Sequence, residues 1–171
     1  MNIFLKILYI IFFIILSVAF IKFALLFLLV ALLLLWLRTW QMKHEPNQQD
    51  FLQGKIPNPK LDGIYYGNMG FDTSWIGKKI DAEQNTGINL FKNKKGVQTS
   101  KYPFKTSVSS GLFDENLLVL KISYNVKGNP FWVRWIEDEI VEIKPSEYLG
   151  KMNLKIIPGL PFSVLYFDLK K

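Results

Sequence analysis

The segment Phe131–Trp135 (FWVRW) combines the residue types best suited to recognising an anionic head group. Arg134 is the one arginine that follows Arg38, and its planar guanidinium could bind a carboxylate through two parallel hydrogen bonds. On a strand, Trp132 and Arg134 would share one face of the sheet. We therefore predict Arg134 and Trp132 as ligand contacts. The alternative, which the residue types favour, is an outward-facing Arg134 that packs on Trp132 beside Glu137.

Three further aromatic residues, Tyr65, Trp75 and Tyr124, lie in segments with strand character and are predicted to line a pocket. The more common role of aromatic side chains at strand spacing is to fill an ordinary core, and this alternative stays open. Lys78 and Lys79 follow Trp75 closely and are expected to face solvent or lipid head groups.

Most catalytic and metal-dependent chemistries lack the residues they need. The chain has no cysteine, which excludes disulfides, thiolate metal sites and cysteine nucleophiles. Its one histidine, His44, lies in a polar stretch, so neither a serine–histidine pair nor a zinc site is expected. The acidic run Glu137–Glu139 is expected to be a solvated loop, because consecutive strand residues point to opposite faces. We predict no catalytic residue, no metal and no cofactor, and an enzyme is the less favoured class.

The charge pattern argues against a nucleic-acid partner. The chain carries 21 basic and 14 acidic residues, a net charge of +7. Only Arg38 and Arg134 are arginines, and the lysines are scattered rather than gathered in a stripe. A weak attraction to anionic lipid head groups fits this pattern better than binding to DNA or RNA.

Residues 1–43 are predicted to be a membrane anchor, because the hydrophobic run Ile7–Leu37 contains one charge, Lys22, and neither Gly nor Pro. As one helix this run would be about 46 Å long, whereas a bilayer core is about 30 Å thick. The favoured arrangement is a single span, either tilted or limited to a stretch such as Phe20–Trp40. A hairpin that turns near Lys22 is the less favoured alternative. The bilayer is thus the first expected partner.

A cleavable signal peptide is a further alternative, with Ser17–Ala19 as the small-residue cleavage site. Fifteen residues of the apolar run still follow Lys22, so we favour a retained anchor. Trp36 and Trp40 suit the aromatic belt at the end of a span. Basic residues after the span slightly favour a cytoplasmic position for the rest of the chain.

Residues 44–60 are polar, contain three prolines and are predicted to be a linker. From residue 61 to 171, short runs with alternating apolar residues lie between turn signals, which predicts seven or eight strands and little helix. Leu118–Tyr124 and Tyr148–Ile156 are the clearest strands, and Phe162–Leu169 is expected to be the last. Asp81–Thr86 is the one expected helical turn. A small closed antiparallel β-barrel explains this alternation and leaves no exposed sheet edge.

Two short motifs carry a family resemblance over residues 61–171. Gly63-x-Tyr65-x-Gly67 resembles the GXWXG signature of a family of calycin-like (lipocalin-like) domains of unknown function, with Tyr65 in place of the tryptophan. Trp75–Asp81 is similar to the W-x-G-K-x-F-D stretch that follows it in that family. The resemblance implies a β-barrel with a small-molecule pocket, and it implies no particular reaction.

These observations predict a membrane-anchored β-barrel that binds a hydrophobic or amphipathic small molecule, such as a lipid or fatty acid. The first alternative is a structural or scaffolding protein whose barrel is filled and whose outer face docks a protein partner. The second is an enzyme of lipocalin-like fold, which would require a buried carboxylate or lysine with a shifted pKa inside the pocket.

Overall fold

The computed structural model describes residues 2–171. The chain divides into two compact units, the first ending at Leu37 and the second covering Arg38–Lys171. Helix α1 (Ile3–Met42) runs without a break through Lys22, where the hairpin alternative required a turn. Its long apolar run contains no helix-breaking Gly or Pro, and its length and composition make it a candidate membrane span.

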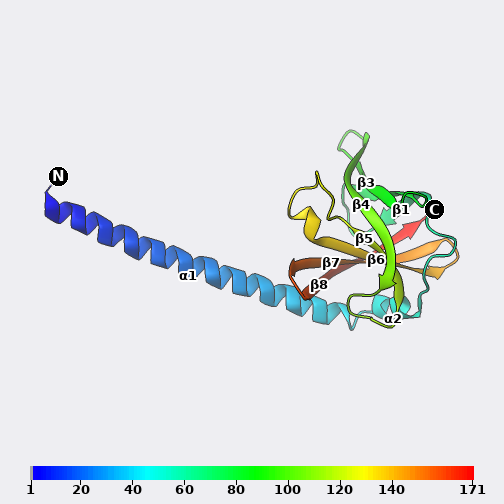
Figure 1. Ribbon diagram of the computed structural model, residues 1–171, viewed down its shortest axis with the longest axis horizontal. Coiled ribbons are helices and arrows are strands. Elements are labelled where there is room, and N and C mark those ends of the chain that lie inside the picture. The colour runs from blue at the N-terminus through cyan, green and yellow to red at the C-terminus, as the bar shows by residue number, and fades with distance from the viewer. Residues whose placement is uncertain (1) are drawn as a thin grey trace. The chain divides into compact units, whose positions relative to one another are not determined.

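The second unit is built around eight antiparallel strands that close into a barrel in chain order, because β1 pairs with both β2 and β8 (Figure 1). The strands are β1 (Gly63–Asn68), β2 (Trp75–Asp81), β3 (Thr86–Lys92), β4 (Gln98–Ser110), β5 (Leu118–Ser123), β6 (Ile136–Lys144), β7 (Glu147–Ile157) and β8 (Leu160–Lys170). The predicted antiparallel β-barrel is therefore confirmed.

The barrel interior holds the main apolar core. Alternate residues of β5 and β6 point inward, as the alternating sequence pattern requires. The buried members of this core are Leu61, Tyr65, Trp75, Ile80, Phe104, Leu120, Ile122, Tyr124, Val133, Ile140, Tyr148, Phe167 and Leu169. Two glycines allow the barrel wall to pack closely: a Cβ on Gly67 would lie 2.2 Å from the Trp75 ring, and one on Gly77 would lie 2.0 Å from the Tyr65 carbonyl oxygen. Gly77 also has a φ of +142°, which other residues rarely adopt.

A second apolar cluster lies on the outside of the barrel wall, beneath helix α2 (Pro46–Gln53). Pro46 suits the first turn of a helix, where its missing N–H has no partner to lose. Phe51 is fully buried and packs with Val141 and Leu149, whose side chains leave the outer faces of β6 and β7. The predicted linker at 44–60 thus contains a helix that is packed against the barrel.

Two local predictions are wrong. Residues 131–135 do not form a strand, because Pro130 starts a turn and Val133–Trp135 is a 3-10 helix, η1, and the strand begins only at Ile136. The backbone N–H groups of Val133 and Arg134 both donate to the Pro130 carbonyl. Residues 82–85 form the hairpin turn between β2 and β3 rather than a helical turn.

Candidate functional site: a polar cluster inside the barrel

Four polar side chains meet inside the barrel, each supplied by a different strand or strand end. Lys78 comes from β2, Asn89 from β3 and Asp138 from β6, while Tyr124 directly follows β5. Between 2% and 6% of each of these residues is exposed. We call these four residues the interior polar cluster.

Lys78 is the centre of the cluster. Its ammonium nitrogen donates to Asp138 Oδ2 at 2.8 Å, to Asn89 Oδ1 at 3.0 Å and to Tyr124 Oη at 2.5 Å. A lysine ammonium has three N–H donors and no acceptor. All three donors of Lys78 are therefore directed at groups of the protein, and none is left for a ligand.

Asp138 accepts hydrogen bonds through one of its two carboxylate oxygens only. Its Oδ2 accepts from Lys78 and from the Tyr124 hydroxyl, the latter at 3.0 Å. Its other oxygen, Oδ1, is buried and has no hydrogen-bond partner, and among the buried side-chain polar atoms of residues 2–171 it is alone in this. An unpaired buried acceptor costs about 1–3 kcal/mol, more when it is charged, so Oδ1 is a point where a donor would bind favourably.

The buried environment shifts the proton equilibria of the cluster. Burial lowers the pKa of Lys78, while the nearby Asp138 carboxylate opposes that change. Burial, together with the same carboxylate, raises the pKa of Tyr124 well above its ordinary value. The rings of Phe167 and Phe104 lie 5.1 and 5.4 Å from the Lys78 nitrogen, close enough to stabilise its charge through cation–π attraction.

The interior polar cluster forms one side of a cavity of about 170 Å³ within the barrel. The remaining lining is apolar or aromatic, and it comes from Met69, Trp75, Phe91, Tyr102, Val133, Ile136, Met152 and Phe167. A small polar group set in a mainly apolar lining is the usual composition of a site for a small amphipathic molecule. We call this cavity the interior pocket.

Comparison with known proteins supports the fold and no more. No protein-family model matches the chain, and no curated protein matches it. The crystal structure of a protein from Thermomonospora curvata is similar, with a TM-score of 0.50 and 17% sequence identity. The match covers 69% of this chain and 79% of that one. At this identity the likeness concerns the barrel fold alone, because proteins that share a fold often differ in function.

Two of the predicted ligand residues lie at the interior pocket. Trp75 and Tyr124 both line it, and the Trp75 indole N–H donates to Asn89 Oδ1 at 3.1 Å. Tyr65 is buried elsewhere in the core, where its ring packs edge-on against Tyr148 and its hydroxyl bonds to the backbone of Asp62. The aromatic prediction thus divides into two pocket-lining residues and one core residue.

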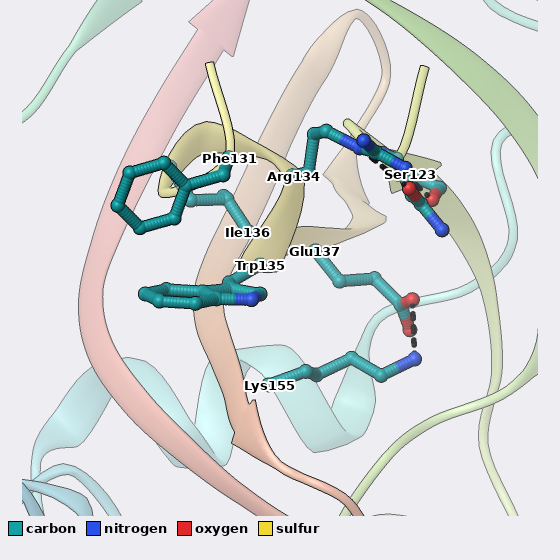
Figure 2. Close-up of a pocket in the computed structure, with 8 residues that line it drawn as sticks. Ser123, Phe131, Arg134, Trp135, Ile136, Glu137 and Lys155 are labelled. Atoms are coloured by element: carbon teal, nitrogen blue, oxygen red, sulfur yellow. Dashed lines mark hydrogen bonds and ion pairs between the residues drawn. The ribbon is translucent and has the colours of Figure 1, made fainter. Parts of the chain in front are cut away.

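The other two predicted residues lie on the surface. Trp132 is 56% exposed, and Arg134 is an exposed residue of η1 whose Nε donates to Asn125 Oδ1 at 2.9 Å. Figure 2 shows the Arg134 side chain extending away from the rings of Phe131 and Trp135. The geometry thus agrees with the outward orientation, although the partner of Arg134 is Asn125 and not Glu137.

Arg134 borders a separate surface pocket of about 380 Å³ (Figure 2). The charged groups of this pocket already have partners: Glu137 pairs with Lys155 at 2.9 Å and with Lys121 at 3.5 Å. An incoming ligand would have to compete with these interactions in contact with water. The interior pocket, which has an unpaired buried oxygen, is the stronger candidate.

The sequence predictions missed Lys78, Asn89 and Asp138. Lys78 was expected in solvent and is buried, and the expected solvated loop at 137–139 is instead buried strand β6. A signal was present in the alternation, because Lys78 lies two residues before the apolar Ile80 and Asp138 lies two residues before Ile140. Both residues were predicted to be solvated because they are charged, and this prediction was wrong.

The acidic residues do not assemble into an evident metal site. Within residues 2–171, no group of three or more His, Cys, Asp or Glu side chains is arranged to hold a metal ion. In the interior pocket, Asp138 is the one carboxylate and Lys78 already neutralises it at 2.8 Å.

Proposed function

We propose that this protein is a membrane-anchored β-barrel that binds a small amphipathic molecule in the interior pocket. The observation that carries this proposal is the mainly apolar cavity with four polar residues on its lining, one of which, Asp138, has a buried Oδ1 without a hydrogen-bond partner. The anchor is the apolar part of α1, whose 31 residues from Ile7 to Leu37 are long enough to cross a bilayer. The motifs Gly63-x-Tyr65-x-Gly67 and Trp75–Asp81 resemble those of calycin-like barrels with small-molecule pockets, and such barrels would be its relatives.

The chemistry of the pocket favours a neutral head group that donates a hydrogen bond. Asp138 Oδ1 requires a donor, and a ligand carboxylate would instead bring a second negative charge beside it. Lys78 cannot compensate, because its three N–H groups already have acceptors. An apolar molecule that bears a hydroxyl, such as a long-chain alcohol or a monoacylglycerol, therefore fits better than a fatty acid.

The test uses the full chain, purified from its native membranes in mild detergent and titrated with two matched probes. The probes are a medium-chain alcohol and the carboxylic acid of the same chain length, with binding measured by calorimetry at neutral pH. We expect the alcohol to bind at least about tenfold more tightly, a difference of about 1.4 kcal/mol. Equal binding, or tighter binding of the acid, would overturn the proposed head-group chemistry.

Two variants separate the interior pocket from the rest of the surface. Val133→Phe fills the cavity with an apolar ring and changes no charge, so it should abolish alcohol binding. Glu137→Gln neutralises a carboxylate one residue before Asp138, on the outer face of β6, and should bind the alcohol like the unmodified protein. Binding that survives in Val133→Phe would place the ligand elsewhere.

Enzymatic use of the buried lysine is a second candidate, because a lysine with a lowered pKa lies in the pocket. The hydrogen bonds of Lys78 support this enzymatic role less than they support a binding role. A nucleophilic lysine must lose its proton, and here three acceptors, one of them a carboxylate at 2.8 Å, hold the ammonium form. Failure of borohydride to trap an added aldehyde on Lys78 would exclude Schiff-base chemistry at this site.

A further inference from the structure

The four loops at one end of the barrel share an unusual surface. In an antiparallel barrel with strands in chain order, the β1–β2, β3–β4, β5–β6 and β7–β8 connections lie at the same end. We call this end the loop rim. Each connection carries, or in the last case directly adjoins, a large apolar side chain that is 48–62% exposed, namely Phe71, Val97, Phe131 with Trp132, and Leu160 at the start of β8.

The largest apolar group on the loop rim is the aromatic tip of the β5–β6 connection. Phe131 packs edge-on against Trp132, with ring centroids 5.0 Å apart, and against Trp135 at 5.3 Å. Asn129 holds this connection in place, because its buried amide donates to the carbonyl oxygens of Pro103 and Tyr124. The tip is therefore a set of exposed aromatic rings on a fixed loop. Contact with water is unfavourable for such a patch, which is typical of an interaction surface.

The strand connections at the two ends of the barrel differ in charge, although the segments that enter β1 and leave β8 bring Lys60, Lys170 and Lys171 to the opposite end. The rim connections contain four basic residues and one acid, which are Lys94, Lys95, Lys127, Arg134 and Asp72. The connections at the opposite end, 82–85, 111–117 and 145–146, contain Glu83, Asp114 and Glu115 and no basic residue. Within the described chain, none of these three opposite connections carries an exposed large apolar side chain, although Leu118, the first residue of β5 beside them, is 54% exposed. Aromatic groups flanked by basic ones match an interface of anionic lipids.

The chain also enters the barrel unit near the loop rim. Arg38, the first residue of this unit, donates through Nε to the Val164 carbonyl at 2.8 Å, and the Ser163 N–H donates to Thr39 Oγ1 at 3.0 Å. Val164 lies four residues after Leu160, within about 15 Å of the rim along β8. Trp40, which is 54% exposed and of a type enriched at bilayer interfaces, directly follows Thr39.

We infer that the loop rim rests on a lipid surface, with Phe131 and Trp132 inserted among the head groups and the rim lysines paired with anionic lipids. This inference rests on the membrane anchoring proposed above, but not on the identity of the ligand. The interior pocket contains Met69 of the β1–β2 connection and Val133 of the β5–β6 connection, so it lies near the same end of the barrel. A molecule dissolved in the bilayer would thus meet the pocket at the membrane surface.

The absence of cysteine makes a direct test straightforward. Trp132→Cys on the aromatic tip and Val97→Cys on the β3–β4 connection are each labelled with bimane in the full chain. Glu83→Cys, at the opposite end of the barrel, is the matched control. The proteins are reconstituted into phosphatidylcholine vesicles with and without phosphatidylglycerol, and flotation reports whether the chain is anchored.

In floated vesicles, we expect labels at 132 and 97 to be quenched by brominated lipid and to lose most of their quenching by aqueous iodide. The label at 83 should behave in the opposite way, and phosphatidylglycerol should increase the difference. Equal iodide quenching at 132 and 83 in floated vesicles would overturn the rim contact while leaving the anchor intact. Protection at 132 in native membranes but not in protein-free lipid would overturn it in favour of a protein partner. Failure to float would refute the anchor and the rim contact together.

Discussion

The ammonium nitrogen of Lys78 lies 2.8 Å from Oδ2 of Asp138, although 60 positions of sequence separate the two residues. Both side chains are at most 4% exposed, so the pair joins β2 to β6 inside the barrel with almost no contact with water. Removing one partner of such a pair leaves a buried charge uncompensated, which is more costly than removing both.

We therefore expect Asp138→Leu to destabilise the barrel by about 3–5 kcal/mol, measured by urea unfolding of the detergent-solubilised protein. The double variant Lys78→Met with Asp138→Leu should recover much of this loss, because apolar residues of similar size can replace a buried pair. Lys79→Met, which changes the exposed neighbour of Lys78, serves as the control and should have little effect. A double variant as unstable as the single one would contradict this view of the pair.

Helix α2 should contribute strongly to the stability of the barrel. Phe51 is fully buried against the outer wall, and the Lys151 ammonium lies 4.2 Å from the centre of its ring. Phe51→Ala should cost about 3–5 kcal/mol in the same unfolding experiment and should expose residues 44–60 to limited proteolysis. Leu52→Ala, at a position that is 49% exposed, should stay within about 0.5 kcal/mol of the unmodified protein. If both variants behave alike, residues 44–60 are a free linker after all.

The buried tyrosines predict a loss of stability at alkaline pH. Burial is the main cause that raises the pKa values of Tyr124 and Tyr166 in the folded protein, whereas an unfolded tyrosine ionises near 10. Above pH 10 the unfolded chain therefore releases protons that the folded chain retains, so the free energy of unfolding falls as the pH rises. Each such group contributes a slope of about 1.4 kcal/mol per pH unit until the pH reaches its folded-state pKa.

Tyr166→Phe should make this alkaline slope shallower, even though it removes the hydrogen bond from the hydroxyl to Gln48 Oε1. The measurement is urea unfolding from pH 9 to 11, combined with the phenolate absorbance of the folded protein. Tyr66→Phe, which changes a 62% exposed tyrosine, is the control and should leave the slope unchanged. Titration of Tyr166 in the folded protein near pH 10 would refute the prediction.

The sequence alone was sufficient to predict the two main parts of this protein, the long apolar helix and the β-barrel. A 31-residue apolar run without Gly or Pro can hardly be anything but a helix, because every local preference and the absence of breakers agree. The alternation in segments such as Leu118–Tyr124 predicted strands with one inward face, and closure follows from the need to leave no sheet edge exposed. These properties depend on neighbouring residues, which a sequence displays directly.

Tertiary structure alone decided which side chains meet. Lys78 and Asp138 come together because barrel closure and strand register bring β2 and β6 to face each other across the interior, and no local pattern records that pairing. Segment 131–135 has strand-forming residues, yet it follows the turn at Pro130 and the loop contacts of Asn129, and its last three residues form a 3-10 helix. Helix α2 has little apolar character of its own and is ordered by burial of Phe51 against the barrel. In each case the deciding free energy comes from contacts between residues that are distant in sequence, and a single sequence does not show which of these residues meet.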